Sequence, residues 1–470
     1  MKELAIFIDT KTKVPVYEQI YVFIKNAVIK GELRAGEALP SSRMLADYLQ
    51  CSRSTVLMAY DQLTAEGYIV TVPQKGCYVM ELDEQFDRSN ETEEIIPVAK
   101  QQEYTVDFSP VGIDTDSFPY SEWRKISRQI WNEENYELLN NGDSRGDYEL
   151  RYNIAGYLRK SRGVKANTDR IIVGSGHENL LQILDFVIDK KAVFGMENPA
   201  YPKAYKVIKA LGRNVRPISL DGYGMNISDL ENNNVDIAYV TPSHQYPTGV
   251  IMPAKRRQEL LKWAVDSPGR YIIEDDYDSE FRYRGKPIPS LQGMDLDDRV
   301  IYIGTFSKSI SPAIRMSYMV LPAGLYEIYA DKMNFVSNSV SRIDQKLVSM
   351  FLANGGFERH LNRMRTAYKS KHEAMLGVLK TFHSITITGE NAGAHMLVEV
   401  NNGMKEEELV KTAAKAGIKV YSLRDCYIDS IDDKKNHKPV IILGYARLKE
   451  EEIRWGLARL NEIWDLSRDG

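Results

Sequence analysis

The chain has 470 residues, of which 43% are hydrophobic and 27% are charged. This length predicts two or three domains, and the composition is typical of a globular protein. The formal net charge of −4 neither indicates nor excludes a nucleic-acid partner, because local charge matters more than the total. Three scattered cysteines (Cys51, Cys77 and Cys426) and seven histidines show no metal-ligand spacing, so we expect reduced thiols and no metal site. The apolar run at residues 4–8 is too short for a signal peptide, and no later stretch could cross a membrane. We therefore expect a cytoplasmic protein.

Composition divides the chain into three segments. Residues 1–82 hold closely spaced amphipathic stretches. Residues 83–105 carry seven acidic and two basic side chains and little that could be buried, which predicts a flexible, self-repelling linker. Over residues 106–470, β-rich runs alternate with helical patterns, which predicts an α/β domain with a mainly parallel sheet.

The first segment predicts three short helices followed by a hairpin. The first helix begins at Pro15 and the second at Pro40-Ser41-Ser42, and the third is capped by Ser52 and closed by Gly67. Two β-rich runs with a Pro- and Gly-containing turn between them then predict a hairpin over residues 68–79. This order is that of a winged helix-turn-helix, in which the third helix faces the major groove of DNA.

The charge of residues 1–82 is balanced, with nine basic and nine acidic side chains, so any attraction to DNA must be local. A small helical module for protein–protein interaction is the alternative interpretation. Phosphate contacts are expected at the starts of the groove-facing helices, where Arg43 and Arg53 stand, and at the tip of the hairpin, where Lys75 stands. Short hydroxyl side chains lie beside them. The run LPSSRMLADYLQCSRSTVLMAYDQLTAEGYI resembles the GntR-family winged helix, which implies binding to a double-stranded DNA operator. The predicted DNA-binding residues are Ser41, Ser42, Arg43, Ser52, Arg53, Ser54, Thr55, Tyr60, Lys75 and Gly76.

The strongest site signal in the large segment is the run Ile301-Tyr302-Ile303-Gly304-Thr305-Phe306-Ser307-Lys308-Ser309, which Arg315 follows. An apolar strand here delivers a lysine among hydroxyls. Pyridoxal 5′-phosphate (PLP) sites use such a set, because the lysine forms a Schiff base, hydroxyls such as those of Thr305 and Ser307 hold the phosphate, and an arginine neutralises its charge. A lysine in an ordinary polar loop is the alternative, and Lys308 alone does not decide between them.

Further clusters in the same segment favour a PLP site. The strand at residues 271–273 ends in acids and Tyr277, and a carboxylate there can pair with a protonated pyridine nitrogen. The run Gly174-Ser175-Gly176-His177-Glu178 opens a helix, and its backbone amides, including those of Gly176 and His177, could cradle a phosphate. Tyr201 can stack on the ring, and residues 241–249 predict a turn at another strand end.

In this order the clusters resemble the fold type I aminotransferases over residues 106–470, which implies a smaller C-terminal α+β subdomain beside the parallel sheet. With the winged helix in front, the chain resembles the MocR/GabR subfamily of GntR regulators. The resemblance implies a head-to-tail, domain-swapped homodimer. It also assigns Lys308 to the Schiff base, Asp275 to the pyridine nitrogen, Tyr277 to the ring hydroxyl, Tyr201 to stacking and Arg315 to the phosphate.

Two departures from these relatives bear on the ligand. Amino-acid aminotransferases clamp the substrate α-carboxylate with an arginine, and Ile442 stands at that position. Isoleucine cannot replace bidentate carboxylate recognition. The GABA-responsive regulator has an arginine two residues after the stacking tyrosine, where this chain has Lys203, and its other carboxylate arginine falls near Arg424. We therefore predict Tyr201, Lys203 and Arg424 as effector-binding residues and a small amino compound as effector.

Together these features predict a PLP-dependent transcription regulator. An amino compound would react with the aldimine of Lys308 and shift the arrangement of the dimer on DNA, with little or no turnover. One alternative is an active aminotransferase with a DNA-binding head, against which Ile442 argues. The other is a regulator that has lost its cofactor and only dimerises, against which the intact set of Asp275, Tyr277, Lys308 and Arg315 argues.

Overall fold

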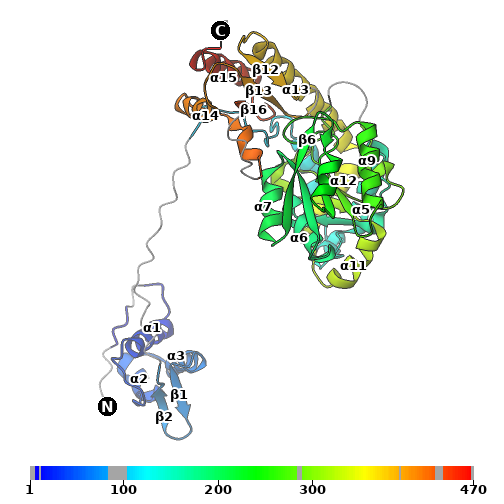
Figure 1. Ribbon diagram of the computed structural model, residues 1–470. Helices are drawn as coiled ribbons and strands as arrows, with labels where there is room; N and C mark the ends of the chain where they lie inside the picture. Colours follow the sequence, from blue (N-terminus) through cyan, green and yellow to red (C-terminus); the bar gives the residue numbers. More distant parts are fainter. Residues whose placement is uncertain are drawn as a thin grey trace. The chain divides into compact units, whose positions relative to one another are not determined.

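The structure is a computed structural model of the chain (Figure 1). It describes residues 6–9, 12–82, 103–282, 288–390, 393–428 and 438–466. The chain divides into two compact units, Met1–Gln101 and Gln102–Gly470, and each is described by itself. Most of the predicted acidic linker, residues 83–102, lies outside the described residues. In the part of the chain that the structure describes, no helix is long and apolar enough to span a membrane.

The first unit contains the predicted three helices and hairpin, which confirms the winged-helix fold. Its elements are α1 (Val16–Ile29), α2 (Ser42–Leu49), α3 (Arg53–Ala65), β1 (Ile69–Val72) and β2 (Gly76–Val79), and the two strands pair antiparallel. Helices α2 and α3 begin where the sequence places a cap, because the hydroxyl of Ser41 accepts from the amide of Met44 at 3.2 Å and that of Ser52 from the amide of Thr55 at 3.1 Å. Ile24 and Leu63 are fully buried between the helices.

The second unit is built on an eight-stranded sheet with the order β4-β11-β10-β9-β8-β5-β6-β7. Strands β6, β5, β8, β9 and β10 pair in parallel, whereas β11 pairs antiparallel with both β10 and β4, and β7 pairs antiparallel with β6. The mainly parallel sheet predicted from the sequence is confirmed. The strands are β4 (Ile171–Gly174), β5 (Val193–Asn198), β6 (Asn214–Asp221), β7 (Gly224–Met225), β8 (Ile237–Val240), β9 (Tyr271–Asp276), β10 (Val300–Thr305) and β11 (Ser317–Val320).

Helices cover both faces of this sheet (Figure 1). Ile172 and Ile303 pack on one face with α6 (His177–Val187), α7 (Pro202–Ala210) and α11 (Ala323–Met333). Val173 and Tyr302, which neighbour them in sequence, pack on the other face with α5 (Tyr148–Arg162) and α12 (Arg342–Ala353). Farther along that face lie α8 (Ile227–Asn232) and α9 (Ala254–Val265). Because both faces of the sheet are covered, apolar residues occupy odd and even positions of each strand. The strands therefore appear in the sequence as continuous hydrophobic runs.

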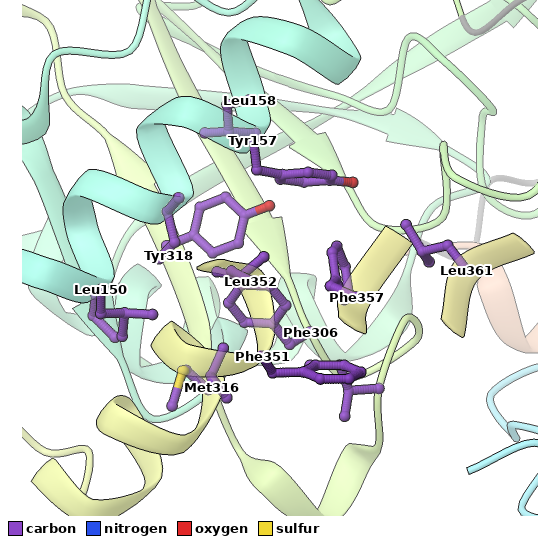
Figure 2. Close-up of a cluster of buried hydrophobic side chains, with 14 of the residues drawn as sticks. Leu150, Tyr157, Leu158, Phe306, Met316, Tyr318, Phe351, Leu352, Phe357 and Leu361 are labelled. Atoms are coloured by element: carbon purple, nitrogen blue, oxygen red, sulfur yellow. The ribbon is translucent and has the colours of Figure 1, made fainter. Parts of the chain in front are cut away.

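An aromatic cluster fixes the chain just before Lys308 (Figure 2). Phe306 is buried, and its ring centroid lies 5.2 Å from that of Tyr318 on β11 and 5.7 Å from that of Phe357. Burying an aromatic side chain of this size contributes roughly 1.5–3 kcal/mol. The core therefore anchors the segment that carries the lysine, so that the turn after β10 has one position.

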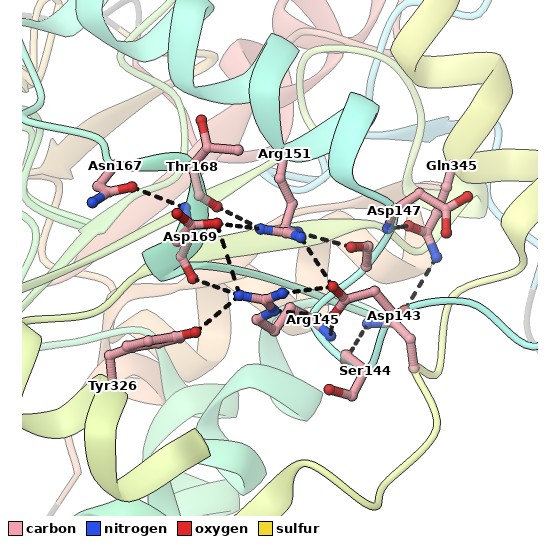
Figure 3. A network of polar contacts seen from close by, with 12 residues as sticks. Asp143, Ser144, Arg145, Asp147, Arg151, Asn167, Thr168, Asp169, Tyr326 and Gln345 are labelled. Carbon is pink, nitrogen blue, oxygen red and sulfur yellow. Dashed lines mark hydrogen bonds and ion pairs between the residues drawn. The ribbon is translucent and has the colours of Figure 1, made fainter.

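A polar network holds the segment that precedes α5 (Figure 3). The guanidinium group of Arg151 is buried and lies 3.1 Å from Oδ2 of Asp143, which also receives Nη2 of Arg145 at 2.7 Å. Nη1 of Arg145 donates to the hydroxyl of Tyr326 on α11 at 2.9 Å. The carbonyl of Arg145 also accepts from the amide of Val173 on β4 at 2.8 Å. The network thus ties this segment to the strand that leads into α6.

The C-terminal part forms the smaller α+β subdomain that the sequence predicts. Its antiparallel sheet has the order β12-β13-β16-β15, with β12 (Ile385–Thr388), β13 (His395–Val400), β16 (Val440–Gly444) and β15 (Tyr421–Ser422). Helices α13 (Gly356–Leu379), α14 (Glu406–Lys415) and α15 (Glu450–Ile463) pack against it around one apolar core. The remaining elements include β3 (Val106–Asp107), which pairs in parallel with β14 (Ile418–Lys419), and α4 (Tyr120–Ile130) and α10 (Leu291–Met294).

Candidate cofactor pocket and DNA-binding surface

A cavity of about 380 Å³ lies at the carboxyl ends of the central strands of the second unit. Parallel strands end at one edge of a sheet, so side chains from distant parts of the sequence converge there. Nine of the eleven residues predicted for the cofactor or effector in this unit line it, and Gly176 and Arg424 are the two that do not. The lining residues are Val111, His177, Glu178, Tyr201, Lys203, Thr241, Tyr246, Asp275, Tyr277, Thr305, Ser307, Lys308, Pro312 and Arg315.

Gly176 has no side chain and contributes only backbone at this position. Arg424 is the one predicted side chain that does not line the cavity.

The lysine that the sequence singles out is buried in this cavity. Lys308 follows β10, where the hydroxyl of Thr305 accepts from the amide of Ser307 at 3.1 Å and from the hydroxyl of Ser317 at 2.9 Å. These bonds shape the turn that presents the lysine. Nζ of Lys308 donates to the carbonyl oxygen of Pro110 at 2.7 Å. Burial disfavours the ammonium form and lowers the pKa of Lys308 to about 8, so a far larger fraction of this amine is neutral near physiological pH than of an ordinary lysine.

Asp275, at the end of β9, is held by two neighbours. The hydroxyl of Tyr239 donates to Oδ2 of Asp275 and lies 2.9 Å from Nε2 of His177, which is itself 3.4 Å from the same carboxylate oxygen. Burial opposes protonation of His177, yet the charge of Asp275 outweighs burial and raises the histidine pKa. Nδ1 of His177 is buried and has no hydrogen-bond partner within the described residues. A fixed carboxylate of this kind suits a cationic ring nitrogen.

The N-terminus of α6 and Arg315 meet at one side of the cavity. Gly176 is the N-cap residue of α6 with φ +96°, and a Cβ atom there would collide with Nη2 of Arg315. Only glycine therefore fits this position without displacing the arginine. Backbone amides at a helix N-terminus beside a guanidinium group make a site for an anion such as phosphate.

Glu178, in the first turn of α6, contacts two cationic side chains, Lys203 and Arg315. Its carboxylate pairs with Nζ of Lys203 and accepts from Nη2 of Arg315 at 2.7 Å. Partial burial would raise the pKa of Glu178, but the contacts with Lys203 and Arg315 hold it at about 2. The carboxylate is therefore ionised at physiological pH.

Aromatic rings also line the cavity. The ring centroid of Tyr246 lies 5.5 Å from that of Tyr201 and 5.8 Å from that of Tyr277, both nearly perpendicular. The hydroxyl of Tyr277 lies 3.0 Å from Nδ1 of His244. Behind Tyr246, Ile442 on β16 is 1% exposed and packs into the same apolar cluster. These three tyrosine rings therefore line the cavity, and the apolar cluster that contains Ile442 supports them from within the fold.

Short polar and basic side chains gather at the start of α3 in the first unit. Nε of Arg53 donates to the hydroxyl of Ser42 at 3.3 Å. The hydroxyl of Ser52 lies 2.7 Å from those of both Ser54 and Thr55. The exposed predicted residues also include Ser41, Arg43, Lys75 and Gly76, the last two at the hairpin turn. The DNA-binding residues predicted at the starts of α2 and α3 thus lie next to one another.

Comparisons with known proteins cover both units. Residues 16–79 match the bacterial regulatory proteins of the gntR family, and residues 113–437 match aminotransferase class I and II. The HTH-type transcriptional regulator YdeL of Bacillus subtilis is 38% identical over 98% of this chain and 99% of its own length. MocR of Rhizobium meliloti, a probable rhizopine catabolism regulatory protein, is 29% identical over 97% of this chain and 95% of its own.

This chain belongs to the MocR-type transcriptional regulators. The second unit of this MocR-type regulator also shares its fold with the crystal structure of a multiple substrate aminotransferase from Thermococcus profundus. That likeness has a TM-score of 0.69 and 23% identity, and it covers 80% of this chain and 95% of the other.

Two predicted residues of the MocR-type regulator do not fit their assigned roles. Tyr60 is 3% exposed, and its hydroxyl donates to the carbonyl oxygen of Pro40 at 2.9 Å. It therefore supports the entry to α2 from inside the core and does not present a group to DNA. Nη1 of Arg424 lies 3.2 Å from Oε1 of Glu407, so its guanidinium group is directed to α14 and away from the effector site.

Other lining residues carried no predicted role. Glu178, Thr241 and Tyr246 lie within runs that marked the site, so their motifs were the available signal. Val111 and Pro312 lie in no such run. Only the folded chain brings them to the cavity.

Proposed function

We propose that this MocR-type regulator binds PLP covalently through Lys308 and senses a small amino compound at that cofactor. Residues 1–82 would bind a double-stranded DNA operator, residues 83–105 would connect the two units, and residues 106–470 would hold the cofactor and dimerise. One observation carries the proposal most directly: a buried lysine with a pKa of about 8 lines the same cavity as Asp275 and Arg315.

The chain's own residues fit PLP. The amides at the start of α6, Arg315 and the hydroxyls of Thr305 and Ser307 would hold the phosphate, and Gly176 keeps that space open. Asp275 would pair with the ring nitrogen, and the unpartnered Nδ1 of His177 leaves a buried donor or acceptor free beside it. When bound, PLP supplies an aldehyde carbon that condenses with amines and a ring that accepts electrons.

The residues around the cofactor favour sensing over catalysis. Lys308 supplies a neutral amine that can leave and return, and Tyr239 keeps Asp275 in place through its hydroxyl. Turnover also requires the ligand to be held at a fixed angle, and such positioning can account for several kcal/mol of a barrier. With Ile442 buried in an apolar cluster, no α-carboxylate clamp stands at its position. We propose ligand binding with little or no turnover.

We propose that the protein acts in the cytoplasm as a homodimer. Effector binding would change the arrangement of the two subunits and so the affinity for DNA. Support comes from the exposed apolar side chains Trp131, Tyr136 and Leu139, which are 65%, 63% and 74% exposed and gather around residues 131–139 of the second unit. Apolar surface of this kind marks interfaces. We propose a head-to-tail arrangement on the family resemblance. A ligand would switch it through different affinity for two arrangements.

The test begins with purified protein reconstituted with PLP and titrated with amines and amino acids by visible absorbance. A compound that shifts the spectrum is then incubated with the protein for hours, and carbonyl product and pyridoxamine phosphate are quantified. We expect a spectral shift, a change in affinity for DNA and less than one turnover. Repeated turnover at roughly 1 per second or faster would make this protein an aminotransferase first.

A further inference from the structure

We propose that Leu57 and Met58 on α3 read thymine methyl groups in the DNA operator. The proposal rests on the proposed binding of residues 1–82 to DNA, and it adds which bases this surface selects. The two side chains are 39% and 53% exposed, although both are apolar and lie in the middle of a helix. The third helix of a winged helix-turn-helix enters the major groove, so side chains on its outer face meet base edges.

The two faces of α3 differ in burial, because consecutive residues of an α-helix are about 100° apart. The inner face consists of four buried side chains, which are Val56, Ala59, Tyr60 and Leu63. They form one apolar core with Ile24 on α1 and Leu45 on α2. Leu57 and Met58 lie on the other face and stay exposed. Packing within this unit therefore leaves their apolar surface open to a partner.

Leu57 and Met58 adjoin the polar residues at the start of α3. Side chains three and four positions apart share a face of a helix, so Ser54 neighbours both of them and Arg53 neighbours Leu57. All four are exposed. Nε of Arg53 donates to the hydroxyl of Ser42 at 3.3 Å, which joins this face to the start of α2. One continuous face thus carries polar groups that suit phosphate and, about one turn further on, two apolar side chains.

This order matches the chemistry of the major groove. The groove is about 12 Å wide and admits an α-helix, and the C5-methyl group of thymine is the apolar group on its base edges. One helical turn advances about 5.4 Å, which corresponds to one or two base-pair steps of about 3.4 Å. A helix held by Arg53 at the edge of the groove therefore brings Leu57 and Met58 to bases one or two steps away. Contact there removes both a side chain and a methyl group from water.

The same face favours DNA over a protein partner. The centres of protein–protein interfaces are depleted of charged side chains, whereas the exposed face here carries Arg53 before the two apolar residues and Asp61 after them. In a major groove, a carboxylate accepts from the amino group of cytosine, and an arginine binds guanine or phosphate. Both charged groups therefore have partners on DNA beside the thymine contacts.

The first experiment removes thymine methyl groups from the operator. An operator is selected from random DNA with the full-length, PLP-loaded protein, and each thymine is replaced in turn by deoxyuridine, which lacks only the C5-methyl group. We expect one or two thymines in each half-site at which the replacement weakens binding about 4-fold, which corresponds to about 0.8 kcal/mol. An affinity that no replacement changes, or a selected half-site without thymine, would overturn the inference and leave DNA binding standing.

The second experiment assigns each sensitive thymine to a side chain. Leu57→Ala and Met58→Ala keep a good helix former and shorten the apolar side chain. Each variant should bind the thymine and deoxyuridine operators equally well at the position that it contacts, since the two changes remove the same interaction. Val22→Ala, which shortens a 43% exposed side chain on α1, is the matched control and should keep the 4-fold difference. A general loss of stability lowers both affinities alike and leaves their ratio unchanged.

The outcomes separate this inference from the proposed function. A 4-fold difference that persists in both α3 variants would overturn the inference. A variant that changes the mass of the DNA-free protein in solution but not the ratio of the two affinities would also overturn it, because it would assign this face to a protein contact. Failure to select any operator would instead overturn the proposed binding of residues 1–82 to DNA.

Discussion

Nζ of Lys308 donates a 2.7 Å hydrogen bond to the carbonyl oxygen of Pro110, a residue 198 positions earlier in the chain. The contact holds the end of a long, flexible side chain at a defined place in the cavity. Because a carbonyl oxygen accepts from both the neutral and the charged amine, the bond orients the lysine in either state.

The first prediction concerns the covalent attachment of PLP. After reconstitution, the protein should be yellow, and reduction with borohydride should fix the cofactor to the peptide that contains Lys308, as mass spectrometry would show. Lys308→Ala should lose the adduct, because no amine remains at the end of β10. A colourless reconstituted protein, or an unchanged adduct in the variant, would rule out this lysine.

The second prediction concerns the pH dependence of PLP capture. Burial lowers the pKa of Lys308 from 10.5 to about 8, and only the neutral amine attacks an aldehyde. At pH 7 about one-tenth of a group with this pKa is neutral, against roughly 0.03% of an ordinary lysine. The capture rate, followed by stopped-flow absorbance, should therefore rise with pH up to about 8 and then level off. A rate that keeps rising through pH 10 would contradict the lowered pKa.

The third prediction concerns DNA affinity. Arg53→Ala removes a guanidinium group that contacts Ser42 at the start of α3, and it should weaken binding to a selected operator by about 1–3 kcal/mol. Smaller losses are expected for Arg43→Ala and Lys75→Ala if they contact phosphate. Lys30→Ala, an exposed change at the end of α1, is the control, and the PLP spectrum should stay the same in all four. Equal affinity in all of them would refute the proposed surface.

The fourth prediction separates a structural role from a DNA contact. Tyr60→Phe keeps the buried ring and removes the hydroxyl that donates to Pro40. It should lower the free energy of unfolding of residues 1–82 by about 0.5–1.5 kcal/mol, measured in urea, because the carbonyl loses its partner. Operator affinity measured well below the unfolding transition should not change. A large loss of affinity in the fully folded variant would restore Tyr60 as a DNA contact.

Local signals in the sequence predicted much of this structure. Ser41 and Ser52 marked the starts of α2 and α3 because an N-cap acts on amides only three residues away. The lysine run marked the end of β10 for a similar reason, since a continuous apolar stretch of strand length is itself a local pattern.

The failures involve partners that are distant in sequence. Tyr60 finds its acceptor 20 residues earlier, and Arg424 finds Glu407 17 residues earlier on another element. A tyrosine that could contact DNA, or an arginine that could bind a ligand carboxylate, instead makes a hydrogen bond or ion pair within the fold. The same reason explains why Glu178 carried no role: its two cationic partners, Lys203 and Arg315, come from separate parts of the chain.

The pairing of β9 with β10 places Ile303 opposite Asp275, and so the ladder sets how far Lys308 lies from that carboxylate. Side chains alternate between the faces of a strand, and a shift by one residue turns every one of them over. An in-frame deletion of one codon within Val300–Thr305 would leave both reactive residues encoded and still separate them. Inactivating genetic variants of this protein should therefore include changes in strand length at residues that take no part in the chemistry.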